Sequence, residues 1–169
     1  MNEGIVDAAE FRSGFVTLVG LANAGKSTLV NALTGESLSI VTARPQTTRQ
    51  RVTAILTTPD HQAVFVDTPG ILEPRYLLQE SMQEEARSGE LDADVLVYVA
   101  DLGFEKSLEH AAAYRPPSGP RTILCLNKRD RVDEETCREL VEAFEGSGDW
   151  EAVVPTTATD GSGVDELRD

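Results

Sequence analysis

Residues 20–29, GLANAGKSTL, combine two glycines, a lysine and a hydroxyl at spacings that can bind phosphate. Gly20–Ser27 matches G-x-x-x-x-G-K-[ST] between an apolar run and a helical segment, which is the context that this motif requires. Glycines let backbone N–H groups approach phosphate oxygens, and a helix N-terminus adds partial positive charge. Lys26 would contact the β and γ phosphates, and Ser27 would offer a hydroxyl to Mg²⁺. The segment predicts a phosphate-binding loop; a plain glycine turn is the alternative.

A second candidate segment, VFVDTPG at 64–70, ends an apolar strand with an aspartate. In nucleotide-binding proteins with such a phosphate loop, a carboxylate at this place reaches Mg²⁺, usually through water. We therefore predict that Asp67 is the metal carboxylate. Gly70 has no side chain, so its N–H could approach a γ-phosphate. The alternative for Asp67 is an Asx turn that closes the strand.

Between these segments lies a polar stretch, ARPQTTRQR at 43–51. A threonine in it could close over the nucleotide as a further Mg²⁺ ligand, which would make the stretch an order–disorder switch. Thr48 is the first choice for that ligand and Thr47 the second. A solvated loop is the equally weighted alternative for its arginines, Arg44, Arg49 and Arg51.

A base-reading segment is predicted at 123–130, ILCLNKRD, where an apolar run delivers Asn-Lys-x-Asp to the carboxyl end of a strand. Guanine presents adjacent N1–H and N2–H₂ donors, and the Asp130 carboxylate can accept both. Adenine would leave that carboxylate unpaired, which is a strong form of rejection. Asn127 could bond the base edge and brace the phosphate loop, and the stem of Lys128 could lie along the base. A charged loop is the alternative.

The last candidate segment, VPTTATD at 154–160, lies at the end of the final apolar run. A backbone N–H near Ala158 could donate to guanine O6. This segment carries the weakest signal of the five.

These segments must be positioned by strands and helices, and the apolar runs indicate an α/β fold. Predicted strands are Phe15–Val19, Val52–Leu56, Ala63–Val66, Val95–Ala100, Thr122–Leu126 and Ala152–Val154. Predicted helices are Lys26–Leu33, Leu77–Ser88, Glu105–Tyr114 and Asp133–Phe144, with a further helix beginning at Gly163. Their alternation predicts a mostly parallel six-stranded sheet with helices on both faces. The second and third strands, joined by a short polar turn, predict one antiparallel edge strand.

The whole composition sets further limits. A length of 169 residues with 40% hydrophobic content is enough for one globular domain. The formal net charge of −14 is unfavourable for binding nucleic acid by this chain alone, because nucleic acid is itself a polyanion. No apolar run could span a bilayer, and the acidic N-terminus lacks the pattern of a signal peptide. The two cysteines, Cys125 and Cys137, are predicted to be unpaired, which suits a cytoplasmic protein.

Taken in order, these segments resemble the TrmE–Era class of translation-factor-related GTPases, and within it the Era family is the most similar. The resemblance rests on GLANAGKST, PQTTRQR, DTPG, NKRD and the terminal GSGVDEL, and it spans the chain from about Phe15 onward. It implies a P-loop GTPase three-layer sandwich, with an N-terminal extension at 1–12 and the GTPase domain at 13–169. The last helix looks truncated, so the chain is expected to be a fragment of a longer protein.

The resemblance also implies a Mg²⁺-dependent GTP switch that assists assembly of the small ribosomal subunit. Family members bind ribosomal RNA through a KH domain, which nothing in this sequence matches, so RNA binding is expected of the parent protein only. The expected location is cytoplasmic, with peripheral contact at the inner membrane face as an alternative. Two departures from the family pattern are Thr157-Ala158 in place of Ser-Ala and a poor match from Leu102 to Pro120, to which no function is assigned.

Some GTPases carry a glutamine that orients the attacking water at the position where this chain has Ile71. The side chain of isoleucine cannot orient or polarise water. Turnover is therefore expected to be slow and to rely on positioning, Mg²⁺, Lys26 and loop amides. In the wider class an asparagine at the position of Asn23 is associated with a monovalent cation, usually K⁺. Stabilisation of the loop turn is the equally weighted alternative.

The resulting predictions assign residues to three roles. Nucleotide-binding residues are Gly20, Asn23, Ala24, Gly25, Lys26, Ser27, Thr28, Asp67, Gly70, Asn127, Lys128, Asp130, Thr157, Ala158 and Thr159. Catalytic residues are Lys26, Asn23, Thr48 and Gly70, and metal ligands are Ser27, Thr48 and Asp67. A GTP-gated binding module with incidental hydrolysis is the alternative to a GTPase, and an ATPase or small-molecule kinase is a third hypothesis.

Overall fold

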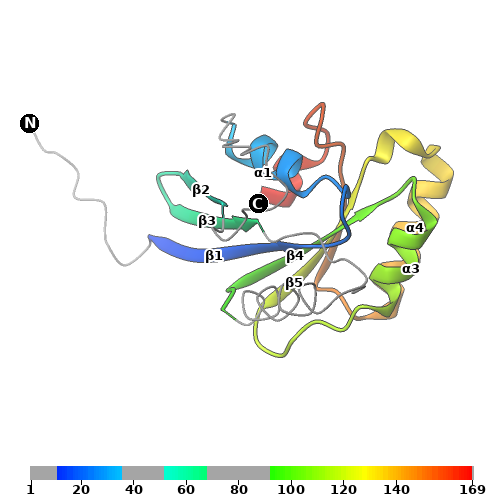
Figure 1. Ribbon diagram of the computed structural model, residues 1–169, viewed down its shortest axis with the longest axis horizontal. Coiled ribbons are helices and arrows are strands. Elements are labelled where there is room, and N and C mark those ends of the chain that lie inside the picture. Colours follow the sequence, from blue (N-terminus) through cyan, green and yellow to red (C-terminus); the bar gives the residue numbers. More distant parts are fainter. Residues whose placement is uncertain (1–10, 36–51, 68–91, 169) are drawn as a thin grey trace, which may run out of the picture.

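A six-stranded sheet with strand order β2-β3-β1-β4-β5-β6 forms the centre of the computed structural model, which describes residues 11–35, 52–67 and 92–168 (Figure 1). The strands are β1 Arg12–Val19, β2 Val52–Thr57, β3 His61–Asp67, β4 Val95–Asp101, β5 Arg121–Asn127 and β6 Ala152–Pro155. Five of them are parallel, and β2 pairs antiparallel with β3 at the edge. The predicted sheet and its antiparallel edge strand are confirmed.

The first strand begins earlier than its apolar run predicts. Arg12–Gly14 belong to β1 although none of them is apolar, because they continue the parallel register with β3 from Arg12↔His61 onward. Backbone pairing, rather than hydrophobicity, therefore sets the start of this strand.

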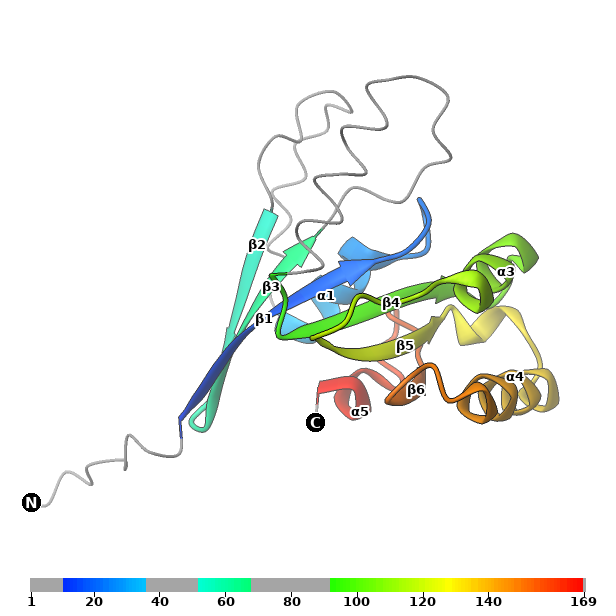
Figure 2. The same cartoon turned by 90° about the horizontal axis from the view of Figure 1, so that it is seen from below.

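Within the described ranges, four α-helices cover the sheet: α1 Lys26–Thr34, α3 Glu105–Ala113, α4 Glu134–Ser147 and α5 Val164–Arg168. In Figures 1 and 2, α1 and α5 lie on one face and α3 and α4 on the other, which is the predicted three-layer arrangement. The predicted helix Leu77–Ser88 lies outside the described residues. Among those residues, no helix is long and apolar enough to cross a membrane.

The ends of α4 differ from the sequence prediction. Asp133 lies just outside the helix, and its carboxylate accepts a hydrogen bond from the Thr136 N–H at 2.8 Å, so it acts as an N-cap. The helix continues through Gly146 and ends only at Gly148, which adopts the left-handed conformation with φ 71°. A single glycine can continue a helix, and the second one supplies the conformation that terminates it.

Each face of the sheet has its own core. On the α1–α5 side, Leu29, Leu33 and Val164 pack on β1, β3 and β4. On the α3–α4 side, Ala111, Cys137, Phe144 and Trp150 pack on the other side of the central strands. Tyr98 is fully buried in this second core, next to the rings of Tyr114 and Trp150. The central strands are thus buried on both faces, as their continuous apolar runs predict.

Candidate nucleotide site

Parallel pairing brings the carboxyl ends of five strands to one edge of the sheet, and the predicted functional segments leave the sheet there. The phosphate loop follows β1, Asp67 ends β3, the Asn-Lys-x-Asp segment begins at the end of β5, and the Thr-Thr-Ala-Thr segment follows β6. Loops at this edge of an open α/β sheet are where such folds bind ligands.

The phosphate loop is packed so closely that two of its positions require glycine. A Cβ added at Gly20 would lie 2.2 Å from the Val99 carbonyl oxygen, and one at Gly25 would lie 2.3 Å from Asn127 Nδ2. Gly25 also has φ 103°, which side-chain-bearing residues rarely adopt. The loop is therefore held against β4 on one side and against the Asn127 side chain on the other.

The helix that follows the loop begins without a side-chain cap. The N-cap residue of α1 is Gly25, which has no side chain to accept a hydrogen bond from the N–H groups of the first turn. Those N–H groups form the positive end of the helix dipole. Ser27 and Thr28, both exposed, lie in this first turn. A phosphate group is the ligand that such a terminus attracts.

Lys26 is the first residue of α1, and it is buried. Its ammonium curls back over the loop and donates to the carbonyl oxygens of Gly20 at 3.0 Å and Leu21 at 2.9 Å. The positive charge is thereby fixed inside the curve of the loop, where a bound phosphate would meet it.

Asn127 joins three segments through a side chain that is almost completely buried. Its Nδ2 donates to the Ala24 carbonyl of the phosphate loop at 2.9 Å. Its Oδ1 accepts from the Thr156 hydroxyl and from the Ala158 N–H, both at 3.1 Å. Because the Ala158 amide can only donate and the Ala24 carbonyl can only accept, the orientation of the Asn127 amide is determined. The predicted bracing of the phosphate loop is confirmed.

Thr156 has a role that the sequence prediction missed. It is completely buried, and its hydroxyl links Asn127 to the thiol of Cys125, whose Sγ lies 3.1 Å away. Burial raises the pKa of the Cys125 thiol to about 12, while the hydrogen bond to Thr156 opposes this shift. The family pattern of this segment indicated the next residue, Thr157. Since both residues are threonines, the sequence alone could not show which one contacts Asn127.

The predicted base-edge donor, the Ala158 N–H, points at Asn127 in this structure. The neighbouring Thr157 is anchored instead by its backbone, since its N–H donates to the Ser162 carbonyl at 2.9 Å and its carbonyl accepts from the N–H groups of Asp160 and Gly161. Thr159 is exposed at the tip of this loop. Contact of Ala158 with guanine O6 stays a prediction.

Lys128 bridges the base-reading segment and the phosphate loop. Its Nζ donates to the Asn23 carbonyl and to Asp101 Oδ2, both at 2.6 Å. Its backbone is left-handed with φ 61°, a conformation that costs a residue other than glycine about 1–3 kcal/mol. Asp101, the last residue of β4, was not predicted from the sequence, because no motif marks it.

Asp130 contrasts with these paired groups. It lies in a short 3₁₀ helix, Arg129–Arg131, and is exposed. Among the described residues, nothing donates a hydrogen bond to its carboxylate and no cation pairs with it. Within the described part of the chain this exposed carboxylate therefore keeps its acceptor sites open, and two adjacent donors of a ligand could occupy them.

The metal ligands can be tested only in part. The backbone of Asp67 pairs with Leu18, which places the end of β3 beside the entry to the phosphate loop. Ser27 is exposed on the first turn of α1. A hydroxyl and a carboxylate fit Mg²⁺, which binds hard oxygen ligands and keeps several waters and substrate phosphates. Within the described ranges no three His, Cys, Asp or Glu residues cluster as a metal site.

Several predicted residues lie outside the described residues: Arg44, Thr47, Thr48, Arg49, Arg51, Gly70 and Ile71. Their assignments stay predictions.

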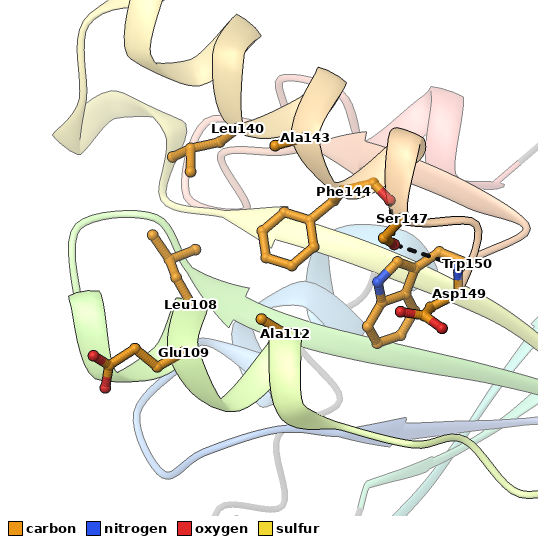
Figure 3. A pocket seen from close by; sticks show the side chains of 9 residues that line it. All are labelled: Leu108, Glu109, Ala112, Leu140, Ala143, Phe144, Ser147, Asp149 and Trp150. Atoms are coloured by element: carbon orange, nitrogen blue, oxygen red, sulfur yellow. Dashed lines mark hydrogen bonds between the residues drawn. The ribbon is translucent and has the colours of Figure 1, made fainter.

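A separate depression lies between α3 and α4, with a cavity volume of about 350 Å³ (Figure 3). Leu108 and Glu109 line it from α3, Leu140 and Phe144 from α4, and Trp150 from the segment after α4. It contains no glycine-rich loop or lysine, so it lacks the groups that mark the strand-end loops as a nucleotide site.

Comparison with known proteins agrees with this geometry. A family model described as "50S ribosome-binding GTPase" matches residues 15–128. A curated relative, GTPase Era of Clostridium acetobutylicum, is 37% identical over 159 residues, covering 93% of this chain and 54% of the relative. Another from Clostridium botulinum (strain Eklund 17B / Type B) is 39% identical and is covered to 55%. The chain thus spans about half the length of the curated relatives that it matches.

A solved structure gives the same result. The chain superposes with a TM-score of 0.77 and 32% identity on Era in complex with MgGDPNP and nucleotides 1506–1542 of 16S ribosomal RNA, covering 93% of this chain and 55% of that one. The six-stranded sheet with its antiparallel edge strand is therefore the fold of a P-loop GTPase domain.

Proposed function

The chain belongs to the 50S ribosome-binding GTPase family, and from that premise we propose that it binds GTP with Mg²⁺ and hydrolyses it to GDP and phosphate as a conformational switch. The observation that carries this proposal is the Asp130 carboxylate, exposed and without a partner among the described residues, in the same segment as Asn127, whose side chain is hydrogen-bonded to the phosphate loop. A carboxylate in this position accepts the N1–H and N2–H₂ groups of guanine and repels the adenine edge.

The phosphates would lie in the loop between β1 and α1. Lys26 would stabilise charge on the β and γ phosphates, and loop amides together with the N-terminus of α1 would bind the remaining oxygens. Bound Mg²⁺ neutralises developing charge on the phosphates, and Ser27, Asp67 and Thr48 are the proposed protein groups that hold it. Gly70 is proposed to detect the γ-phosphate through its N–H.

Slow intrinsic hydrolysis is part of the proposal, since the side chain of Ile71 has no group that could hydrogen-bond to and orient water. Asn23 is the residue proposed to recruit K⁺ beside the phosphates. Its backbone is left-handed with φ 64°, and its side chain forms no hydrogen bond with any described residue. Asparagine tolerates this conformation better than most residues, so stabilisation of the loop turn stays the alternative role for Asn23. Equal hydrolysis rates in KCl and NaCl at one ionic strength would remove K⁺ from the proposal.

Nucleotide binding by the 169-residue chain is the first test. Fluorescent mant-GDP should bind, GTP should displace it, and ATP at equal concentration should not. In a single turnover with radiolabelled GTP, phosphate should be released with Mg²⁺ and not with EDTA. Displacement by ATP would contradict guanine recognition, and no release of phosphate over hours would contradict hydrolysis.

The proposed biological role is that of an Era-type GTPase in assembly of the small ribosomal subunit. The relatives with the same domain are GTPase Era, and one solved Era structure contains 16S ribosomal RNA, whereas the broader family description refers to the 50S subunit. We favour the small subunit because the Era match covers 93% of the chain. RNA contact is proposed for a KH domain of the parent protein, since this chain has a net charge of −14.

RNA binding by this chain can be measured directly. A fluorescent oligonucleotide with the sequence of the end of 16S ribosomal RNA should not bind this chain at moderate salt. Tight binding would contradict the role given to the KH domain. We place the activity in the cytoplasm; pelleting of the chain with anionic lipid vesicles would instead support peripheral contact with the inner membrane face.

A further inference from the structure

Asp101 is a buried carboxylate at the edge of the sheet where the nucleotide loops meet. Its Oδ2 accepts from Lys128 Nζ at 2.6 Å and from Arg131 Nη1 at 3.2 Å, and its Oδ1 accepts from the Gly103 N–H at 3.0 Å. Each oxygen is therefore occupied by a donor from this chain. A buried charge with these partners is compensated and is not free to receive a ligand.

The three donors come from different places. Gly103 follows β4, so its bond closes a local turn, and Arg131 has a half-exposed side chain. Lys128 is different, because the same ammonium also donates to the Asn23 carbonyl of the phosphate loop at 2.6 Å. A continuous path of short polar contacts thus runs from the end of β4 through Lys128 to the phosphate loop.

We propose that Asp101 is a positioning residue of the nucleotide site, which holds the Lys128 side chain in place so that it can support the guanine base and clamp the phosphate loop. The inference rests on the proposed function and adds a residue that no motif marks. Asp101 does not touch the nucleotide in this account; it acts through Lys128.

The physical reason is preorganisation. A lysine side chain has four rotatable bonds, and without a fixed partner its ammonium would have to be ordered when the nucleotide binds. The Asp101 carboxylate orders it beforehand, so less of the binding free energy is lost. It also offsets the left-handed backbone of Lys128, which would otherwise favour relaxation of the base-reading segment. The expected consequence is slower release of bound guanine nucleotide.

Asp94 offers a matched control. It lies immediately before β4, as Asp101 lies at its end, and its Oδ2 also accepts from a backbone N–H, that of Phe15 at 2.8 Å. Asp94 lies at the amino ends of the parallel strands, whereas the nucleotide loops lie at their carboxyl ends. Asp94→Asn therefore removes the same charge and perturbs the same kind of hydrogen bond, far from the nucleotide loops.

The experiment measures mant-GDP release by stopped flow for the wild type, Asp101→Asn, Lys128→Met and the double variant. We expect Asp101→Asn to accelerate release by about tenfold, and Asp94→Asn to leave it unchanged. Since both residues act through one contact, the double variant should release no faster than Lys128→Met alone. Arg131→Gln, which removes the other cation of Asp101, should accelerate release less than Asp101→Asn.

Wild-type binding is measured first, so that the two proposals can fail separately. If the wild type does not bind mant-GDP, the proposed function falls and this inference with it. If it binds but Asp101→Asn releases at the wild-type rate, or the effects of Asp101→Asn and Lys128→Met multiply, only the role of Asp101 is overturned. Circular dichroism without nucleotide checks folding, and Asp101→Ser, which keeps an acceptor for the Gly103 N–H, replaces Asp101→Asn if that variant does not fold.

Discussion

Two aspartates near the ends of adjacent strands show how partners, rather than residue type, decide a role. Asp101, at the end of β4, is buried and occupied by three donors from its own chain. Asp130, three residues beyond β5, is exposed and has no partner among the described residues. A carboxylate whose acceptors are filled can organise a site, and one whose acceptors are open can recognise a ligand. The two regions are therefore expected to respond differently to the same substitution.

The largest effect is expected at the open carboxylate. Asp130→Asn should weaken mant-GDP binding by at least about 100-fold, because an amide places an N–H₂ group against the donors of guanine. Equilibrium titration measures the affinity. The matched control is Asp133→Asn, which removes the same charge three residues away and keeps a good helix cap.

Two results would break this comparison. An equal loss of mant-GDP affinity in Asp130→Asn and Asp133→Asn would show that net charge, and not base recognition, controls the affinity. Loss of thermal stability in Asp130→Asn without nucleotide would show that its carboxylate has a structural partner after all.

The next effect concerns the brace between the two regions. Asn127→Ala removes a buried side chain that joins Ala24, Thr156 and Ala158. Leaving these groups unpaired should lower the free energy of unfolding by about 2–4 kcal/mol even without nucleotide. Denaturant unfolding measures this loss; a stability equal to the wild type would mean that the phosphate loop does not depend on the brace.

Much of this arrangement is predictable from sequence. Continuous apolar runs locate all six strands, because the inner strands of a parallel sheet are covered on both faces and so carry apolar side chains in succession. The phosphate loop, Asp67 and the Asn-Lys-x-Asp segment are found from their spacing and from the strands that they follow. These features are local in sequence, so a short window contains the whole signal.

The unpredicted features are long-range contacts. Asp101 meets Lys128 across 27 positions, and Thr156 meets Asn127 across 29, so no short pattern contains both partners. Thr156 and Thr157 are chemically identical neighbours, and only the path of the chain after β6 decides which hydroxyl faces Asn127. The early start of β1 likewise depends on pairing with β3.

A smaller loss of stability should distinguish the roles of Thr156 and Thr157. Thr156→Val removes the hydroxyl that donates to Asn127 Oδ1, which keeps its bond from the Ala158 N–H. The expected cost is about 1 kcal/mol, or a melting temperature lower by about 2–4 °C. Thr157→Val is the control, since the Thr157 side chain has no hydrogen bond with the described residues, and it should lose less. The reverse order would contradict the assignment of Thr156.

The smallest effect is a pH dependence from Cys125. Burial raises its pKa to about 12, above the ordinary value of 9.0, so only the unfolded chain loses this proton as the pH first rises past 9. Below pH 9 the protonated thiol makes its full contribution to the free energy of unfolding. That free energy should fall by about 0.8 kcal/mol by about pH 9.5. Comparing unfolding free energies of the wild type and Cys125→Ala across this range isolates it. Identical slopes would contradict the burial of the thiol.

The most direct test of guanine recognition by Asp130 is a change of base preference. Xanthine carries a carbonyl where guanine carries N2–H₂, so the amide of Asp130→Asn can donate to that carbonyl while accepting from N1–H. Competition of GDP and xanthosine diphosphate against a fluorescent nucleotide measures the preference in the wild type and the variant. We predict that the wild type prefers GDP and that Asp130→Asn prefers xanthosine diphosphate. An unchanged preference for GDP in the variant would contradict the account.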